Sequence, residues 1–178
     1  MRILSIDPSL RNTGVIEALY LNDKLKILNA ITHKTVSKSK ESFLSAGEHD
    51  TLCAMHLATC ITDMINANKP DLICAEIGSG AQSHSAAAAL GAMKGFIGGL
   101  MSQHNKINWV IVTPAEAKRI IRPNVDKGVI QAWVLKNYKE YTWDKIKNKF
   151  EHQADAVIIA LAGIKKFKER HKNEIEFK

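Results

Sequence analysis

Ile3-Leu4-Ser5-Ile6-Asp7-Pro8-Ser9, near the start of the chain, is the stretch that decides the fold. Apolar and polar residues alternate over part of this stretch, and some of them are β-branched, which predicts a strand. Pro8 cannot donate a hydrogen bond to a neighbouring strand, so the strand is expected to end at Asp7. Turn residues follow over 11–14, and two more strands are predicted over 15–21 and 24–33. Asn22-Asp23 is the turn between them. We therefore expect an antiparallel meander of three strands.

Helical and strand patterns alternate along the rest of the chain. Apolar residues at helical spacing, Pro70 and Pro114 set the boundaries of these elements. The predicted helices cover 48–68, 83–103, a short stretch with Pro114 in its first turn, 126–138 and 151–167, and the predicted strands cover 71–76 and 108–113. This order predicts an α/β fold, with a mixed sheet flanked by helices. We expect one domain over 1–178, with a charged tail over 168–178.

Composition narrows the class of protein. The chain has 178 residues, of which 46% are apolar, which is enough for one sizeable core. No apolar run approaches the roughly 20 residues of a membrane span, so no membrane partner is expected. The first residues reach the charged side chain of Asp7 too soon for a signal peptide. The three cysteines are an odd number and cannot all form disulfides within the chain. These features predict a cytoplasmic protein.

Charge is distributed unevenly along the chain, whose formal net charge is +7 at pH 7. Residues 1–90 carry 8 basic and 9 acidic side chains, whereas residues 91–178 carry 17 and 9. A basic second half indicates a face that attracts a polyanion. An ordinary basic surface that keeps the protein soluble is the alternative, and charge alone leaves both interpretations open.

Carboxylates stand where two predicted strands end, at Asp7 and Glu76. A third, Asp155, follows His152 at the spacing that puts both on one face of the last helix. Ligands of open α/β sheets bind beyond the carboxyl ends of the strands, so these side chains are candidates for one site. Gathered carboxylates repel one another unless a cation such as Mg²⁺ or Mn²⁺ neutralises them. Each acid taken alone has a plainer interpretation as a solvated side chain.

Several short blocks, in order along the chain, carry a family resemblance. They are Ile3–Ser9 with Thr13-Gly14, Ala75-Glu76, Ala89–Gly95, Thr113–Lys118 with Asp126–Val129, and His152-Gln153-Ala154-Asp155-Ala156. In this pattern the chain resembles the RuvC-like Holliday junction resolvases, a branch of the ribonuclease H-like superfamily. The resemblance spans essentially the whole chain.

The resemblance implies a ribonuclease H-like fold, a homodimer, and metal-dependent paired nicking of four-way DNA junctions in recombination and repair. Asp7, Glu76 and Asp155 would then be catalytic metal ligands for two Mg²⁺ or Mn²⁺ ions. His152 stands where the family often has an acid, and an imidazole can ligate Mn²⁺ or transfer a proton. Lys118, a further catalytic candidate, and Lys127 would support the phosphate backbone. The other expected DNA contacts are Arg11, Ser79, Arg119 and Arg122, and a branch-migration motor is a candidate partner.

Ser79 replaces an aromatic residue that inserts into the junction in well-known members of the family. A nuclease for flaps or other branched DNA is therefore an alternative, as is a non-catalytic junction-binding protein. An actin-like sugar kinase or ATPase is not expected, because 178 residues leave no room for its second lobe.

Three local patterns have competing interpretations. Cys53, His56 and Cys60 share a helix face, and core cysteines are favoured over a zinc site. The Ala- and Gly-rich helix over 83–103 suits close packing in the core or against a second subunit. Lysines over 136–149 surround Tyr138, Tyr141 and Trp143, a stretch that suits DNA contact or a solvated face.

Overall fold

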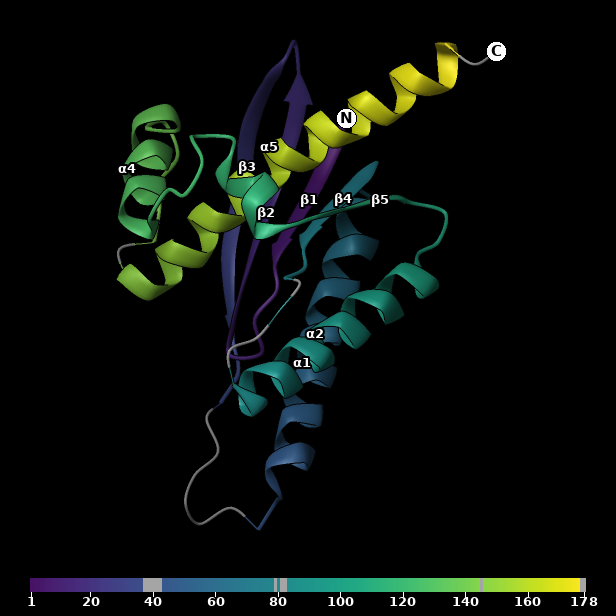
Figure 1. The fold of residues 1–178 in the computed structure, drawn as a ribbon, viewed down its shortest axis with the longest axis vertical. Helices are drawn as coiled ribbons and strands as arrows, with labels where there is room; N and C mark the ends of the chain where they lie inside the picture. Colours follow the sequence, from purple (N-terminus) through teal and green to yellow (C-terminus); the bar gives the residue numbers. More distant parts are fainter. Residues whose placement is uncertain (37–42, 79, 81–82, 145, 177–178) are drawn as a thin grey trace.

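A five-stranded mixed sheet forms the centre of the protein (Figure 1). The computed structural model describes residues 1–36, 43–78, 80, 83–144 and 146–176. The strands are β1 (Arg2–Asp7), β2 (Asn12–Leu21), β3 (Lys24–Lys34), β4 (Leu72–Glu76) and β5 (Asn108–Val112), in the order β3-β2-β1-β4-β5. β1, β2 and β3 are antiparallel, whereas β4 runs parallel to β1 and to β5. The predicted meander and mixed sheet are confirmed.

The turn between β2 and β3 has the backbone that a tight hairpin needs. Asn22 and Asp23 have φ angles of 50° and 57°, the left-handed conformation that Asn and Asp tolerate well. β2 begins at Asn12, three residues earlier than predicted, because Gly14 pairs with Asp7 at the end of β1. The segment expected as a turn is therefore partly strand.

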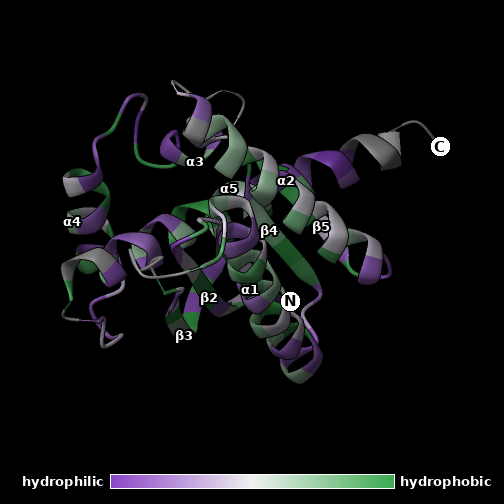
Figure 2. Ribbon diagram, turned by 90° about the horizontal axis from the view of Figure 1, so that it is seen from below, coloured by the Kyte–Doolittle hydropathy of each residue, from purple (hydrophilic) through white to green (hydrophobic). Residues whose placement is uncertain are grey.

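Alternate residues of β1 face opposite sides of the sheet and enter two different apolar clusters. Ile3 belongs to the cluster on the side of α5 (Lys147–Glu176). Leu4 and Ile6 belong to the cluster formed with α1 (Ala46–Asn68) and α2 (His84–Gln103). The strands are mostly green, the hydrophobic end of the scale, in Figure 2. The sheet is thus covered by helices on both faces, and odd-numbered residues of β1 face α5.

α1 begins at Ala46 because its amino end is fully capped. Ser45 and Glu48 form a capping box, in which each side chain accepts a hydrogen bond from the other residue's backbone N–H. Cys53 lies on the buried face of this helix, whereas His56 is exposed and Cys60 is half-buried. The interpretation of Cys53 as a core residue is confirmed.

α5 is longer than predicted, and this corrects the expected tail. The helix covers 147–176 rather than 151–167, so most of the charged segment is helical. This segment lacks an apolar stripe but contains good helix formers such as Lys, Glu and Arg, and it projects past the sheet toward the C-terminus in Figure 1. Nearer its centre α5 packs tightly on β4, because a Cβ at Gly163 would collide with the Sγ atom of Cys74.

α3 (Pro114–Lys118) and α4 (Lys127–Asn137) connect β5 to α5. Two aromatic residues after α4, Tyr141 and Trp143, are half-buried and pack against the core. The hydroxyl oxygen of Tyr141 accepts a hydrogen bond from the backbone N–H of Ala30 at 2.8 Å, and its ring lies 4.7 Å from that of Trp143. Trp143 also contacts Phe150, at 5.5 Å between ring centroids. These rings therefore pack on one another and on the core. None of the described helices is both long and apolar enough to span a membrane.

Candidate active site

Asp7 and Glu76 lie next to each other at the carboxyl ends of two parallel strands. The register pairs Ile6 of β1 with Ala75 of β4, so the next residue of each strand is an acid. Because side chains alternate along a strand, Asp7 shares the face of Ile3, and Glu76 shares the face of Leu72 and Cys74. Both carboxylates thus face α5, at the sheet edge that the sequence predicted.

α5 brings His152 and Asp155 to this edge. The Nδ1 atom of His152 lies 2.7 Å from Oδ2 of Asp7, a hydrogen bond between elements far apart in the sequence. The close approach depends on Gly14, because a Cβ there would collide with the backbone carbonyl of His152. Gly14 pairs directly with Asp7, so the same residue positions both partners.

Burial and mutual repulsion disfavour the charged forms of two of these acids. Burial, and next the charges of Asp7 and Asp155, raise the pKa of Glu76 to about 7 from an ordinary 4.5. Burial, and next the charge of Asp7, likewise raise the pKa of Asp155 to about 6 from 3.8. Nearby Lys127 acts in the opposite direction on both pKa values. Both acids therefore keep their protons to a higher pH than solvated carboxyl groups do.

The same negative charges favour the charged form of His152, whereas they disfavour the charged forms of the acids. Its hydrogen bond to Asp7 raises the pKa of the imidazole above 6.5, although burial opposes this. The charges of Asp7, Glu151 and Asp155 add to the increase. An imidazolium at this position donates to the Asp7 carboxylate and partly neutralises it.

Two lysines stand near the carboxylates. Lys118 ends α3, and Lys127 is the first residue of α4, where Asp126 caps the helix by accepting a hydrogen bond from the backbone of Val129. Both ammonium groups lower the pKa of Glu76. The hydrogen bond and the effects on one another's pKa values place six residues near one another, namely Asp7, Glu76, Asp155, His152, Lys118 and Lys127, and the roles expected of them remain predictions.

Glu151 is a further charged residue here that the sequence analysis missed. Its carboxylate forms a salt bridge with the ammonium group of Lys127. It raises the pKa values of both His152 and Asp155. The signal was present in the sequence, since Glu151 precedes Asp155 by four residues and so shares its helix face.

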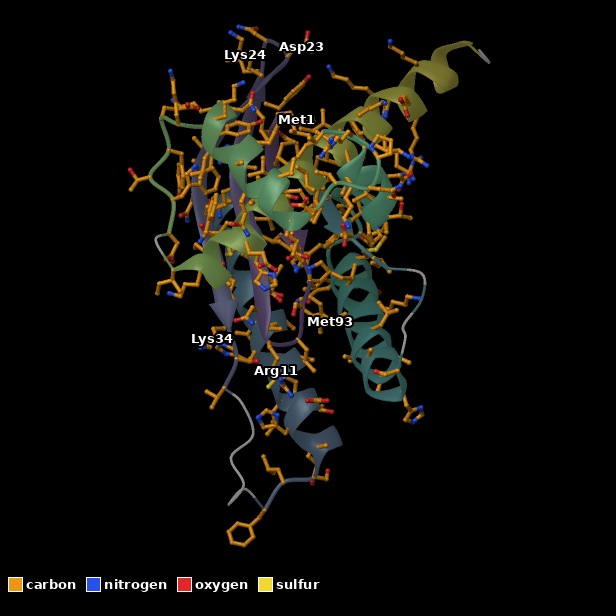
Figure 3. All side chains as sticks on the ribbon, turned by 60° about the vertical axis from the view of Figure 1, so that its left-hand side comes forward. Met1, Arg11, Asp23, Lys24, Lys34 and Met93 are labelled. Carbon is orange, nitrogen blue, oxygen red and sulfur yellow. The ribbon has the colours of Figure 1, made fainter. Side chains whose placement is uncertain are left out.

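A cavity of about 300 Å³ opens beside Glu76. It lies between the segment after β1, the segment after β4, and α2, which contributes Met93, labelled in Figure 3, and Lys94. Pro8, Ser9 and Leu10 form its other wall. Glu76 therefore borders a cavity that is also lined by the positively charged Lys94.

Other expected DNA contacts lie apart from the carboxylates or outside the described residues. Arg11 donates to Asp50 at 2.5 Å and to the Sγ atom of Cys53 at 3.0 Å, so it is bound to α1. Arg119 lines a different cavity with Lys165 and Lys166, and Arg122 is exposed. Ser79 lies outside the described residues. In Figure 3 Arg11 and Lys34 lie toward one end of the molecule, and Asp23 and Lys24 at the other.

The donor set suits a divalent cation in chemistry. Within the described ranges no three His, Cys, Asp or Glu side chains converge closely enough to hold a metal ion as they stand, and one oxygen of Asp7 is bound to His152. Yet the carboxyl groups of Asp7, Glu76 and Asp155 are hard oxygen ligands of the kind that Mg²⁺ and Mn²⁺ prefer. The raised pKa values of Glu76 and Asp155 indicate a site that gains from an added cation. These residues therefore fit such an ion by the chemistry of their ligand atoms, whereas their present spacing does not hold one.

Comparison with known structures identifies the fold. Over 91% of this chain and 92% of the other, it matches T. thermophilus RuvC in complex with Holliday junction substrate, with a TM-score of 0.70 and 16% identity. It has the fold of the RuvC-like resolvases. The yeast mitochondrial Holliday junction resolvase Ydc2 matches over 99% of this chain and 82% of its own length, with a TM-score of 0.67 and 15% identity.

A viral protein shares the RuvC-like fold as well. Fowlpox virus resolvase, in complex with substrate Holliday junction DNA, matches over 94% of this chain and 99% of its own length, with a TM-score of 0.59 and 15% identity. No protein-family model matches the sequence, and no curated protein matches it significantly. The likeness is therefore one of fold, and it confirms the predicted ribonuclease H-like architecture.

Proposed function

We propose that this protein is a metal-dependent DNA endonuclease that resolves four-way junctions by paired nicking. The observation that carries the proposal is the gathering of Asp7, Glu76, Asp155 and His152 at one edge of a RuvC-like sheet. The structural neighbours named above include two resolvases bound to Holliday junction DNA, which supports the choice of substrate.

Asp7, Glu76 and Asp155 would hold the divalent ions, two in number, with His152 as a further ligand or proton carrier. Such ions polarise a phosphoryl oxygen, lower the pKa of water and stabilise the leaving oxygen of an in-line displacement. The chain's own part is to keep the carboxylates at the sheet edge and to bring His152 within proton-transfer distance of Asp7. Lys118 and Lys127 attract the phosphate to this edge.

Recognition would depend on the shape and charge of the branch. Phosphate contacts position a protein on DNA without reading its sequence, and the second half of the chain supplies most of the excess positive charge. Trp143 and Tyr141 are half-buried, and the contacts between their rings and with the backbone of Ala30 hold them against the core. Junction geometry, not base identity, is thus the feature that this surface is suited to recognise.

A homodimer would match the two-fold symmetry of a four-way junction. The helix α2 supports this part of the proposal, because its small residues lie at the surface: Gly91, Gly95, Gly98 and Gly99 are exposed, and a Cβ at each would meet no neighbour within 4 Å. The core interpretation of these glycines is therefore not favoured. A second copy packed on this face would place two active sites on one junction.

The test is cleavage of a labelled four-way junction beside matched duplex, three-way and flap DNA, with Mg²⁺ and with Mn²⁺. The wild type would run beside Asp7→Asn and beside Asp63→Asn, which changes an exposed acid of α1. We expect symmetric nicks in the four-way junction that are abolished in the first variant and kept in the second. Equal cleavage of flaps would favour a general branched-DNA nuclease, and tight binding without cleavage would leave a junction-binding protein.

A further inference from the structure

The salt bridge between Lys127 and Glu151 joins two helices beside the carboxylates. Lys127 stands at the first position of α4, and Glu151 lies one residue before His152 on α5. The side chain of Lys127 is 62% exposed, whereas that of Glu151 is 22% exposed. The lysine is therefore the reachable partner, and the glutamate is the more firmly held one.

Helix stability does not explain a lysine at this position. The amino end of a helix carries a partial positive charge, so a cation there is electrostatically unfavourable. Asp126 already caps α4, since its side chain accepts a hydrogen bond from the backbone N–H of Val129. The cap fixes where the backbone of Lys127 lies, and Glu151 fixes where its ammonium group lies.

The ammonium group of Lys127 also acts on the carboxylates to which it is not hydrogen-bonded. Its charge lowers the pKa values of Glu76 and Asp155. Its own pKa is raised first by the hydrogen bond to Glu151 and then by the charges of Glu151, Asp155 and Asp7. An ammonium has three N–H donors, and the bond to Glu151 uses one of them. No other described residue is hydrogen-bonded to this ammonium group, which leaves two donors for an anion that approaches the cluster.

We propose that Glu151 is a positioning residue that holds the ammonium group of Lys127 beside the acid cluster, so that its free N–H groups receive a DNA phosphate. The inference rests on the proposed nuclease function and assigns a role to a residue outside the expected metal ligands. A lysine side chain has four rotatable bonds, and ordering such a side chain on binding costs about 0.5–1.5 kcal/mol. Holding it in advance corresponds to a gain of between about two- and tenfold.

The opposite role would be a shield, in which Glu151 competes with the phosphate for Lys127. The two roles predict opposite changes in cleavage when Glu151 is replaced. A positioning residue predicts slower cleavage at subsaturating junction when Glu151 is replaced, whereas a shield predicts tighter junction binding and faster cleavage.

A double-mutant cycle tests the proposal. We expect Glu151→Gln to slow cleavage of subsaturating four-way junction between about two- and tenfold, and to add no further loss in a Lys127→Met background. Lys118→Met is the matched control background, because Lys118 forms no salt bridge within the described part of the chain; there the full loss should persist. A full loss in the Lys127→Met background, or a gain in either binding or cleavage, would overturn the proposal.

A second measurement separates this inference from the nuclease proposal. The side-chain ¹⁵N signals of the lysines in the full-length protein would be compared between wild type and Glu151→Gln, without DNA or metal. The signal of Lys127 should shift, while that of Lys166, which is paired with Glu116 at 2.8 Å, should not. An unchanged Lys127 signal would overturn the proposal even in an active nuclease, and a protein that cuts no DNA would overturn the nuclease function whatever this signal shows.

Discussion

His152 and Asp7 are hydrogen-bonded at 2.7 Å although 145 positions separate them in the chain. One lies on the last helix and the other at the end of the first strand. The contact exists because Gly14, opposite Asp7 in the sheet, leaves room for the backbone of α5. This contact ties the protonation of the imidazole to the charge of the acid that we propose as a metal ligand.

Replacing Asp7 with Asn is expected to lower the pKa of His152. The hydrogen bond to the Asp7 carboxylate is the largest cause of the raised value, and an amide cannot stabilise the imidazolium in the same way. An NMR titration of the His152 ring would measure the change. Asp50→Asn is the control, because that acid lies 3.8 Å from His49 and should leave His152 unaffected. An unchanged or higher pKa for His152 in Asp7→Asn would contradict the contact.

The stability of the metal-free protein is expected to fall as the pH rises from about 4.5 to about 7. Over this range the folded state keeps a proton on Glu76 that the unfolded state has lost, so raising the pH favours unfolding. The raised pKa values of Asp155 and His152 act in the same sense. Urea unfolding in EDTA at pH 5 and pH 7.5 would measure the loss.

Glu76→Gln is expected to make the metal-free protein more stable than the wild type at pH 7.5, by on the order of 2 kcal/mol, because the amide carries no charge to bury. Glu169→Gln, an exposed position on α5, is the control and should change little. If Glu76→Gln keeps the pH dependence of the wild type, Glu76 is not the main group that makes the stability fall with pH.

Mg²⁺ or Mn²⁺ is expected to stabilise the wild type and to do so more strongly at pH 8 than at pH 6. The cation must displace protons from Glu76 and Asp155, so its affinity rises with pH. At a hundred times its Kd a bound ion adds about 2.7 kcal/mol. Unfolding curves with and without metal would show the gain. If Asp155→Asn gained as much as the wild type, these carboxylates would not be the ligands.

Gly14→Ala is expected to destabilise the protein by about 1–3 kcal/mol, because the new methyl group collides with the backbone of His152 and must displace α5. It should also slow any cleavage, since His152 moves with the helix. The matched change is Gly47→Ala in the first turn of α1, where a Cβ meets nothing within 4 Å and a more stable helix is expected. Equal effects of the two substitutions would show that α5 does not depend on Gly14.

The strand ends and their acids were predictable from the sequence because their signals are local. Pro8 ends the pattern of the first strand at Asp7, and the alternation of side chains then decides which face Asp7 and Glu76 share. The spacing of His152 and Asp155 likewise follows from helical geometry alone. The computed fold confirms these elements and their order.

The remaining features depend on contacts between distant segments. Arg11, whose expected contact with DNA stays a prediction, is hydrogen-bonded to Asp50 and Cys53 on α1, and no local pattern reveals such partners. The pair of Lys127 and Glu151 depends on where α4 meets α5. The last part of α5, over 168–176, has no apolar stripe, so periodicity could not detect there a helix that its residues nonetheless favour.

The most direct test of the central claim is to map the cuts that the wild type makes in a labelled four-way junction with Mg²⁺ or Mn²⁺. The account predicts paired nicks at symmetric positions, no cuts by Asp7→Asn, and junction binding that survives in that variant. A wild type that binds the junction but leaves it intact in both metals would contradict the claim that Asp7, Glu76, Asp155 and His152 form a nuclease site.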